Sequence, residues 1–384
     1  SMFNAPDWLT YLKVRGSYTE VGNSYGRFMT TVTYPYDEQT QSWTSTSSYP
    51  NTKLKPERTK SWEVGLDARI LNDISLNLTY YRSNTYNQTF YADLSLSSGY
   101  SNIPIQSGNI MNEGLEMSLG YNKQWKDFSF NTNYTLTWNK NRVKRLADGV
   151  YNYATGQPIQ MPELSPLTYG HTDARLILRV GGSMGDVYGQ RLLKRDLNGY
   201  ILNEEGVGLA MENKETYLGS ILPKMNMGWS LGFGYKGVNL GMTFTGRFGG
   251  IVISETQSVL DAAGVSKVSA DVRDAGGVQI NQSKVSAQTY YQTIQGTAAY
   301  YTYSATNVRL GELSLSYTLP KKWFDNKVGM TVGLVGKNLW MIYCKAPFDP
   351  ELTTSAASNF YQGFDAYMPV SYTHLRAHET GRNL

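Results

Sequence analysis

Ile74-Ser-Leu-Asn-Leu-Thr-Tyr80 is the stretch that decides the fold, because apolar side chains occupy every second position and polar ones lie between them. The same period of two returns in residues 130–138, 229–235 and 313–319. A β-strand with this pattern has one apolar face and one polar face. Many such strands predict a sheet that covers its apolar face with lipid or with a second sheet.

Alternation and turn residues predict about twelve strands, near 8–21, 60–70, 74–84, 114–123, 127–140, 174–181, 186–194, 227–236, 238–248, 307–319, 328–340 and from about 369. Short connections such as Asn72-Asp73 and Lys236-Gly237 alternate with long polar ones, of which 249–306 is the longest. Outer-membrane barrels have short periplasmic turns and long extracellular loops. We therefore predict an all-β, antiparallel transmembrane β-barrel. The alternative is a soluble or surface-exposed β-sandwich that serves binding or adhesion without transport and buries the same apolar face between two sheets.

Composition agrees with a barrel and excludes several other classes. The 384 residues carry a net charge of +4, from 35 basic and 31 acidic side chains, without a dense basic run, so nucleic acid is a poor candidate partner. The 30 Tyr residues suit a membrane interface, where the ring is buried and the hydroxyl stays wet. A mean hydropathy of −0.40 fits a polar lumen and polar loops. Cys344 is the single cysteine, so an internal disulfide is excluded.

Three motifs of other functions lack the context that their chemistry requires. His374 and His378 have the i, i+4 spacing of zinc ligands but not the order of a zinc protease motif. Gly232-x-Gly234-x-x-Gly237 matches a dinucleotide fingerprint, yet it lies in a predicted strand and turn, where small lumen-facing residues are the better interpretation. Asp196-x-Asn198-Gly199 has its glycine at the wrong position for a calcium loop and is a hairpin turn signal. We predict no metal site and no cofactor.

An enzyme is not predicted either, because His171 is the one histidine available for a catalytic set. Glu63, Asp67 and Arg69 share the polar face of the strand at 60–70, and we interpret them as a lumen-facing ion network.

Seven segments in order resemble one family over about residues 8–370. They are Leu12-Lys-Val-Arg-Gly-Ser-Tyr18, Leu54-Lys-Pro-Glu-Arg-Thr-Lys-Ser-Trp-Glu-Val-Gly65, Asn109-Ile-Met-Asn-Glu-Gly-Leu-Glu116, Pro223-Lys-Met-Asn-Met-Gly-Trp229, Val308-Arg-Leu-Gly-Glu-Leu-Ser-Leu-Ser-Tyr-Thr-Leu-Pro320, Gly336-Lys-Asn-Leu-Trp340 and Phe348-Asp-Pro-Glu351. With these segments the chain resembles the C-terminal part of the barrel of SusC/RagA-like TonB-dependent outer-membrane transporters.

The resemblance implies a barrel of 22 strands in the outer membrane of a Gram-negative bacterium, of which this chain would supply about 12. It implies import of oligosaccharides or peptides through a plugged barrel with a SusD-like lipoprotein lid. It also implies coupling to the TonB–ExbB–ExbD complex through an N-terminal region that we expect to precede this fragment. Residues 1–370 would form the barrel portion, while 371–384 look like translated adapter or vector sequence.

Aromatic residues crowd the predicted outer loops. Aromatic faces stack on sugar rings and also anchor protein interfaces, so these loops are candidate contacts for a ligand or a lid, with loop packing as the third interpretation. The candidates are Trp43, Tyr49, Tyr300, Tyr301, Tyr303, Phe360, Tyr361 and Phe364.

Overall fold

The structure is a computed structural model. It describes residues 6–44, 46–106, 108–146, 163–168, 172–196, 199–200, 209–280, 283–324, 328–351, 363–365 and 375–377. Within these ranges, every helix is too short and too polar to cross a membrane.

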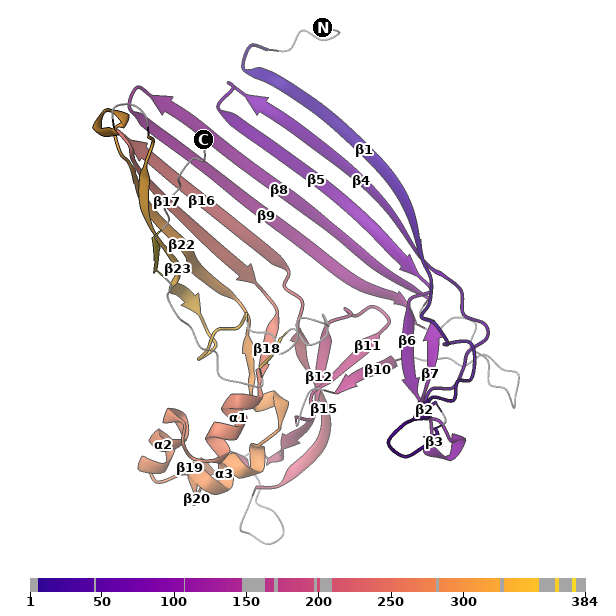
Figure 1. Ribbon diagram of the computed structural model, residues 1–384. Coiled ribbons are helices and arrows are strands. Elements are labelled where there is room, and N and C mark those ends of the chain that lie inside the picture. Colours follow the sequence, from indigo (N-terminus) through magenta and orange to yellow (C-terminus); the bar gives the residue numbers. More distant parts are fainter. Residues whose placement is uncertain are drawn as a thin grey trace.

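One large, curved antiparallel sheet forms the wall of a partial barrel (Figure 1). Its strand order is β1-β4-β5-β8-β9-β16-β17-β22-β23-β25, so each strand pairs with the next long strand along the chain. The strands are β1 (Leu9–Asn23), β4 (Glu57–Ile70), β5 (Ile74–Tyr86), β8 (Asn109–Trp125), β9 (Phe128–Arg145), β16 (Met225–Tyr235), β17 (Val238–Phe248), β22 (Asn307–Thr318), β23 (Thr331–Cys344) and β25 (Leu375–Ala377). The predicted antiparallel barrel architecture is confirmed.

The connections segregate by length, as predicted. Tight turns join β4 to β5, β8 to β9 and β16 to β17 at one end of the sheet, which is the upper end in Figure 1. Leu71 and Asn72 both have positive φ, and so do Lys236 and Gly237. Tyr235 pairs with Val238, so Lys236 and Gly237 form a two-residue loop whose two positive φ angles are those of a type I′ turn, which matches the right-handed twist of the strands; three residues connect Ile70 and Ile74.

The long connections fold into a cap at the other end of the sheet (Figure 1). The cap contains a four-stranded sheet of β10 (Glu163–Thr168), β11 (Arg175–Arg179), β12 (Asp186–Leu193) and β15 (Met211–Ser220). A three-stranded sheet joins β18 (Ile251–Ser254), β21 (Thr302–Ser304) and β24 (Phe364–Asp365). Four hairpins complete the strands, namely β2 (Tyr36–Asp37) with β3 (Ser42–Trp43), β6 (Thr89–Asp93) with β7 (Asn102–Gln106), β13 (Arg195–Asp196) with β14 (Gly199–Tyr200), and β19 (Val278–Ile280) with β20 (Ser283–Val285).

Two strands that the sequence placed in the barrel lie in the cap instead. The segments predicted at 174–181 and 186–194 form β11 and β12 of the four-stranded sheet. Their apolar residues Leu176, Leu178 and Val187 have no exposed surface. Alternation shows only that one face of a strand is apolar, and here that face covers a protein core rather than lipid.

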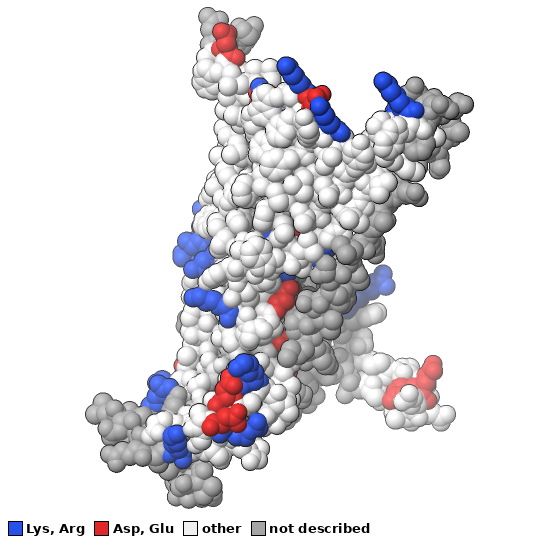
Figure 2. Space-filling model, turned by 90° about the vertical axis from the view of Figure 1, so that its left-hand side faces the viewer, with Lys and Arg blue, Asp and Glu red and all other residues white. Residues whose placement is uncertain are grey.

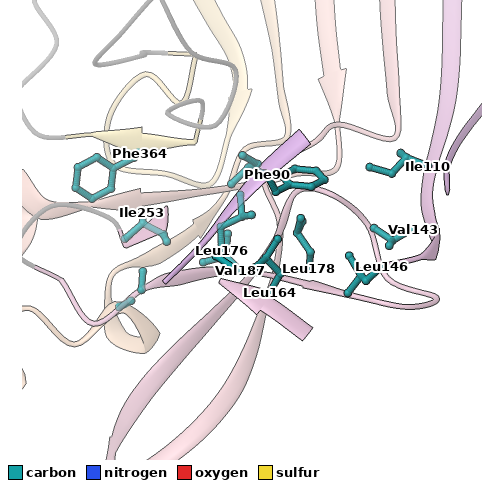
Figure 3. Packing of buried hydrophobic residues seen from close by; sticks show 14 of the residues in the cluster. Phe90, Ile110, Val143, Leu146, Leu164, Leu176, Leu178, Val187, Ile253 and Phe364 are labelled. Atoms are coloured by element: carbon teal, nitrogen blue, oxygen red, sulfur yellow. The ribbon is translucent and has the colours of Figure 1, made fainter. Parts of the chain in front are cut away.

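The main hydrophobic core lies in the cap, not in the barrel wall. Phe90, Leu164, Leu178, Ile253 and Phe364 come from five different strands and belong to one buried cluster (Figure 3). The barrel strands add only their loop ends to it, Ile110 from β8 and Val143 from β9. The apolar side of the barrel sheet is covered by lipid, so it does not need a protein core. The loops lie in water and must bury their apolar side chains against one another.

The connection at 249–306, predicted as a polar loop, contains three helices. They are α1 (Glu255–Ala262), α2 (Lys267–Asp274) and α3 (Ala287–Ile294). Each begins after a serine, Ser254, Ser266 or Ser286, whose hydroxyl accepts a hydrogen bond from the backbone N–H three residues on. Such caps satisfy free N–H groups in the first turn and let short helices form.

A last strand was predicted from about residue 369. Residues 366–374 lie outside the described part of the chain, and β25 pairs with Leu334–Gly336 of β23. The division of the chain at residue 370 stays a prediction.

Candidate functional site

One row of residues, paired from strand to strand across the sheet, supports the prediction that the outer face of the sheet contacts lipid. The row crosses nine strands and contains Leu12, Ala68, Leu76, Leu119, Tyr134, Trp229, Phe244, Leu310 and Trp340. Leu119, Trp229 and Trp340 leave 41%, 42% and 63% of their surface exposed. Figure 2 shows a broad stretch without charged side chains between the charges near the upper end of this side and those from its middle downward. An apolar row without a protein cover requires lipid.

Aromatic residues mark the turn end of this wall. The last paired row of the apolar face at this end consists of Trp125, Phe128, Tyr235, Val238, Tyr317 and Val332. Trp138 lies ten residues from Phe128 along β9 and marks the loop end. This separation is about 34 Å along the strand at ~3.4 Å per residue, or about 26 Å across the membrane at a tilt of ~40°. The apolar belt of outer-membrane barrels is about 25 Å tall.

The β-sandwich alternative is wrong. In a sandwich, the Leu, Phe and Trp side chains of the alternating strands would pack between two sheets. In the structure the same side chains lie on the uncovered side of a single curved sheet.

The opposite face of the sheet is polar. The row next to the apolar one contains Lys13, Asp67, Asn77, Ser118, Thr135, Gly228, Thr245 and Arg309. Arg15 on β1 donates to the Thr79 hydroxyl at 2.6 Å and lies 3.7 Å from the Asp67 carboxylate. Asp67 therefore takes part in a lumen-facing network, as predicted. The predicted partners Glu63 and Arg69 form no ion pair with any residue that the structure describes, so the network runs between strands rather than along one strand.

Glycine and turn motifs take the places that the sequence predicted. Gly232 and Gly234 lie on the polar face, opposite Asn131 and Ser129, and Gly237 lies in the turn with a φ of +87°. A Cβ at Gly232 would be 2.5 Å from the Asn131 side chain, so the inner face is crowded at this point. Asp196 pairs with Gly199 in the β13–β14 hairpin, as the Asn-Gly signal indicated; His171, His374 and His378 lie outside the described residues.

An ion cluster centred on the buried Arg309 lies at the loop end, and it was not predicted from the sequence. Arg309 donates to both carboxylate oxygens of Asp349, at 2.8 and 2.9 Å, and lies 3.3 Å from Glu351. Only 9% of the Arg309 side chain is exposed. Asn307, fully buried, accepts from Arg309 and donates to Glu351. Arg309 belongs to the family-like segment 308–320, and Asp349 and Glu351 belong to the segment 348–351. The presence of both segments in the sequence was the available signal for this cluster.

The Arg309 cluster lies at the edge of a cavity of about 400 Å³. Leu339, Trp340 and Phe348 line it together with Arg309 and Asp349. A bidentate arginine–carboxylate pair fixes orientation as well as charge. The arrangement ties the connection after β23 to the polar face of β22.

Two aspartates hold the cap together. Asp173 accepts from the backbone N–H groups of Gln190, Arg191 and Ala298, at 2.7 to 3.0 Å, and so links three segments. Asp186, which is 7% exposed, accepts from the Ser183 N–H at 2.8 Å and from the Tyr217 hydroxyl at 3.2 Å.

Burial raises the pKa of the Asp186 carboxyl above its ordinary value of 3.8, although the hydrogen bonds from Ser183 and Tyr217 act in the opposite direction. Tyr217 is anchored at its hydroxyl while its ring stays outside, with 56% of the residue exposed. The hydrogen bonds of Asp173 and Asp186 therefore tie separate segments of the cap together.

The predicted contact residues have different positions. Trp43 is 71% exposed, and its ring lies 5.1 Å from Tyr36 in the β2–β3 hairpin. Tyr49 packs edge-on against Tyr100 at 5.1 Å. Tyr303 packs on Phe348 at 5.6 Å.

Three further candidates pack into the cap. Tyr301 and Phe364 are only 2% and 4% exposed, which fits the loop-packing interpretation. The Tyr300 hydroxyl accepts from the Leu193 N–H at 3.1 Å. Phe360 and Tyr361 lie outside the described residues. Contact with a ligand or a lid stays a prediction for this set, and Trp43 is the most exposed of the six candidates that the structure describes.

Comparison with known proteins places this geometry in a family. The family model described as TonB dependent receptor-like, beta-barrel matches residues 3–339. TonB-dependent receptor P3 of Formosa agariphila is 25% identical over 411 residues, which covers 98% of this chain and 39% of that protein. TonB-dependent receptor SusC of Bacteroides thetaiotaomicron is 27% identical over 132 residues, or 34% of this chain and 12% of that protein.

A solved structure of the RagAB peptide transporter has the same fold. It superposes with a TM-score of 0.66 at 21% identity and covers 88% of this chain and 38% of its own. The chain spans about two fifths of the length of TonB-dependent receptor P3 and of this RagAB chain.

Proposed function

This chain belongs to the TonB-dependent receptor-like β-barrel family of the Gram-negative outer membrane, and we propose that the whole protein that carries it imports oligosaccharides. The observation that supports this most directly is the two-faced sheet. Its outer rows are apolar and its inner rows are polar across the long strands. A wall of this kind gives a polar solute a hydrated path through lipid. Proteins of this family are transporters and receptors rather than enzymes.

Energy for import would come from the inner membrane. We propose coupling to the TonB–ExbB–ExbD complex through a plug and contact segment that precede this chain in the whole protein. The test is uptake by cells that express the full-length gene and its lid lipoprotein, with and without the TonB complex. Uptake should stop when the complex is removed, and uptake that continues unchanged contradicts the coupling.

Peptide is the alternative substrate class. The similarity in fold to a structure described as a peptide transporter suggests this alternative. At 21% identity the similarity supports a shared fold and not a shared substrate. Growth of the expressing strain on an oligosaccharide mixture or on a peptide mixture as the sole carbon source separates the two. Growth on peptides alone would overturn the oligosaccharide proposal and leave the transport proposal intact.

A SusD-like lipoprotein is proposed as the lid over the cap. The β2–β3 hairpin lies beyond the end of the large sheet (Figure 1). Its residues Trp43 and Tyr36 are 71% and 48% exposed, and their rings pack on each other at 5.1 Å. Exposed Trp and Tyr residues are frequent anchors of protein interfaces.

We expect Trp43→Ala to reduce copurification of the lid at least tenfold, since hot-spot truncations cost about 2 kcal/mol or more. Tyr91→Ala is the matched control, because Tyr91 is an exposed aromatic on the neighbouring β6–β7 hairpin. Equal losses in both variants, or no loss in either, would contradict a specific role of Trp43.

A further inference from the structure

The outer wall carries a rim of positive charge just beyond its apolar belt, at the loop end. The rim comprises five cations, Arg58 and Lys60 on β4, Arg82 on β5, and Lys140 and Arg142 on β9. Two carboxylates, Glu20 on β1 and Glu113 on β8, lie in the same paired rows. The rim therefore has an excess of three positive charges.

The register and the inward contacts of β9 show that these side chains face outward. Asn139 accepts from the Tyr81 hydroxyl at 3.2 Å, and Asn141 accepts from the Met184 N–H at 2.7 Å. These residues, with the buried Val143, point into the barrel and cap. Side chains alternate along a strand, so Lys140 and Arg142 point to the outside, where both are exposed.

The rim lies directly beside the membrane belt. Lys60 is two residues from Trp62, Arg82 two from Tyr80, and the rings of Trp62 and Tyr80 are 5.4 Å apart. Two residues along a strand correspond to about 7 Å. Long basic side chains at this height keep their stems on the apolar surface and their charges in the headgroup layer.

The ion pairs of the rim leave part of its charge unbalanced. Glu20 lies 3.2 Å from Arg58 and 3.7 Å from Lys60, and Glu113 lies 3.9 Å from Lys140. Arg82 and Arg142 pair with no carboxylate in the part of the chain that the structure describes.

At the turn end of the wall, two of the cations have carboxylate partners. Lys123 pairs with Asp73, and Lys236 lies 3.9 Å from Asp127. The turn end also carries Lys126, Lys321 and Lys322, which pair with no carboxylate among the described residues, so the loop-end rim is distinguished by its place beside the outer leaflet, because the long loops face the cell exterior.

We propose that this rim binds the phosphate groups of the outer-leaflet glycolipid, lipid A. Outer-leaflet lipid is the occupant that lies at this height on every side of a barrel, and its phosphates match the unpaired guanidinium groups. The inference depends on the membrane orientation of the sheet and not on what the protein transports.

The test uses the full-length protein in detergent with purified lipid A, dephosphorylated lipid A and inorganic phosphate as probes. The rim variant carries Arg58→Gln, Arg82→Gln, Lys140→Gln and Arg142→Gln. The matched control removes four exposed cations from the turn end by Lys126→Gln, Lys236→Gln, Lys321→Gln and Lys322→Gln. Gel migration with and without heating verifies that both variants are folded barrels, because heating unfolds the barrel and changes its migration.

The rim variant should bind lipid A at least about 25-fold more weakly. Each near-surface cation contributes about 1 kcal/mol, or about fivefold in affinity; Arg82 and Arg142 form no ion pair within the described residues, although Arg82 lies opposite Glu113 in the register. The control should change by less than about twofold, since its charges lie beyond the screening length. Glu113→Gln removes a repulsive charge and should strengthen binding by up to about fivefold.

Unchanged affinity of the rim variant overturns the proposal, and so does equal affinity for dephosphorylated lipid A. Competition by inorganic phosphate at concentrations equal to those of lipid A would assign the rim to a free anion instead. A rim variant that keeps lipid A but loses the lid lipoprotein would assign it to a protein partner.

Discussion

Leu119→Arg tests the assignment of the outer row to lipid. Its cross-strand partner Tyr134 lies six residues from Phe128 and four from Trp138, the two ends of the belt on β9. At ~3.4 Å per residue and a tilt of ~40°, Leu119 is about 16 Å from the turn-end interface and about 10 Å from the other. This position is close to the bilayer midplane, where arginine costs about 2–4 kcal/mol. We expect a loss of about 3 kcal/mol in the free energy of unfolding.

The assay is denaturant unfolding of the full-length protein in lipid vesicles, with two controls. Val238→Arg places the same side chain on the same face at the turn-end interface, where the cost should be about 0–1 kcal/mol. Leu119→Met conserves volume and polarity and should cost less than about 1.5 kcal/mol. Equal losses for the two arginine variants would refute the reasoning, because they would show that depth along the strand does not matter.

Three further predictions test single contacts. Gly114→Ala should destabilise the protein by about 1–3 kcal/mol in the same unfolding assay, since its Cβ would lie 2.5 Å from a backbone carbonyl oxygen, whereas Gly16→Ala, with 3.8 Å to its nearest atom, should be neutral or stabilising. Asp349→Ala removes the bidentate partner of the buried Arg309 guanidinium and leaves it Glu351 at 3.3 Å, which should cost about 1.5–3 kcal/mol, and the pair Arg309→Met with Asp349→Leu should restore most of the loss. Asp186 has a raised pKa, so the folded state binds more protons than the unfolded chain, and its contribution to stability should be greatest below pH 3.8 and fall as pH rises through the raised pKa. Asp186→Asn should remove this part of the pH dependence. Melting temperatures of the variant and of the unmodified protein, recorded at a series of pH values, will show the difference.

The barrel wall could be predicted from the sequence to a large extent. Alternation over 74–80 and 229–235 identified strands, and glycine and asparagine positions located the turns Asn72-Asp73 and Lys236-Gly237. These signals are local, because a strand's faces and a two-residue turn depend on neighbours within a few residues.

The cap could not be assigned in the same way. Leu176 and Leu178 alternate like the wall residues, yet they are fully buried in a core assembled from distant loops. Tyr301 and Phe364, chosen as contacts because they lie in loops, belong to the cap cores. The α1–α3 helices are not predicted from the sequence, because their apolar positions are few and their start signals are single serines.

The order of residues thus decides that each strand has an apolar and a polar face, because successive side chains along a strand point to opposite faces. It does not decide what covers the apolar face. That depends on which strands meet: Leu119 in the long sheet faces the bilayer, while Leu178 in the short one faces Phe90 and its neighbours in the core cluster. The Arg309–Asp349 pair shows the same dependence, since 40 positions separate its partners along the chain and only the folded connection brings the two charges within 3 Å.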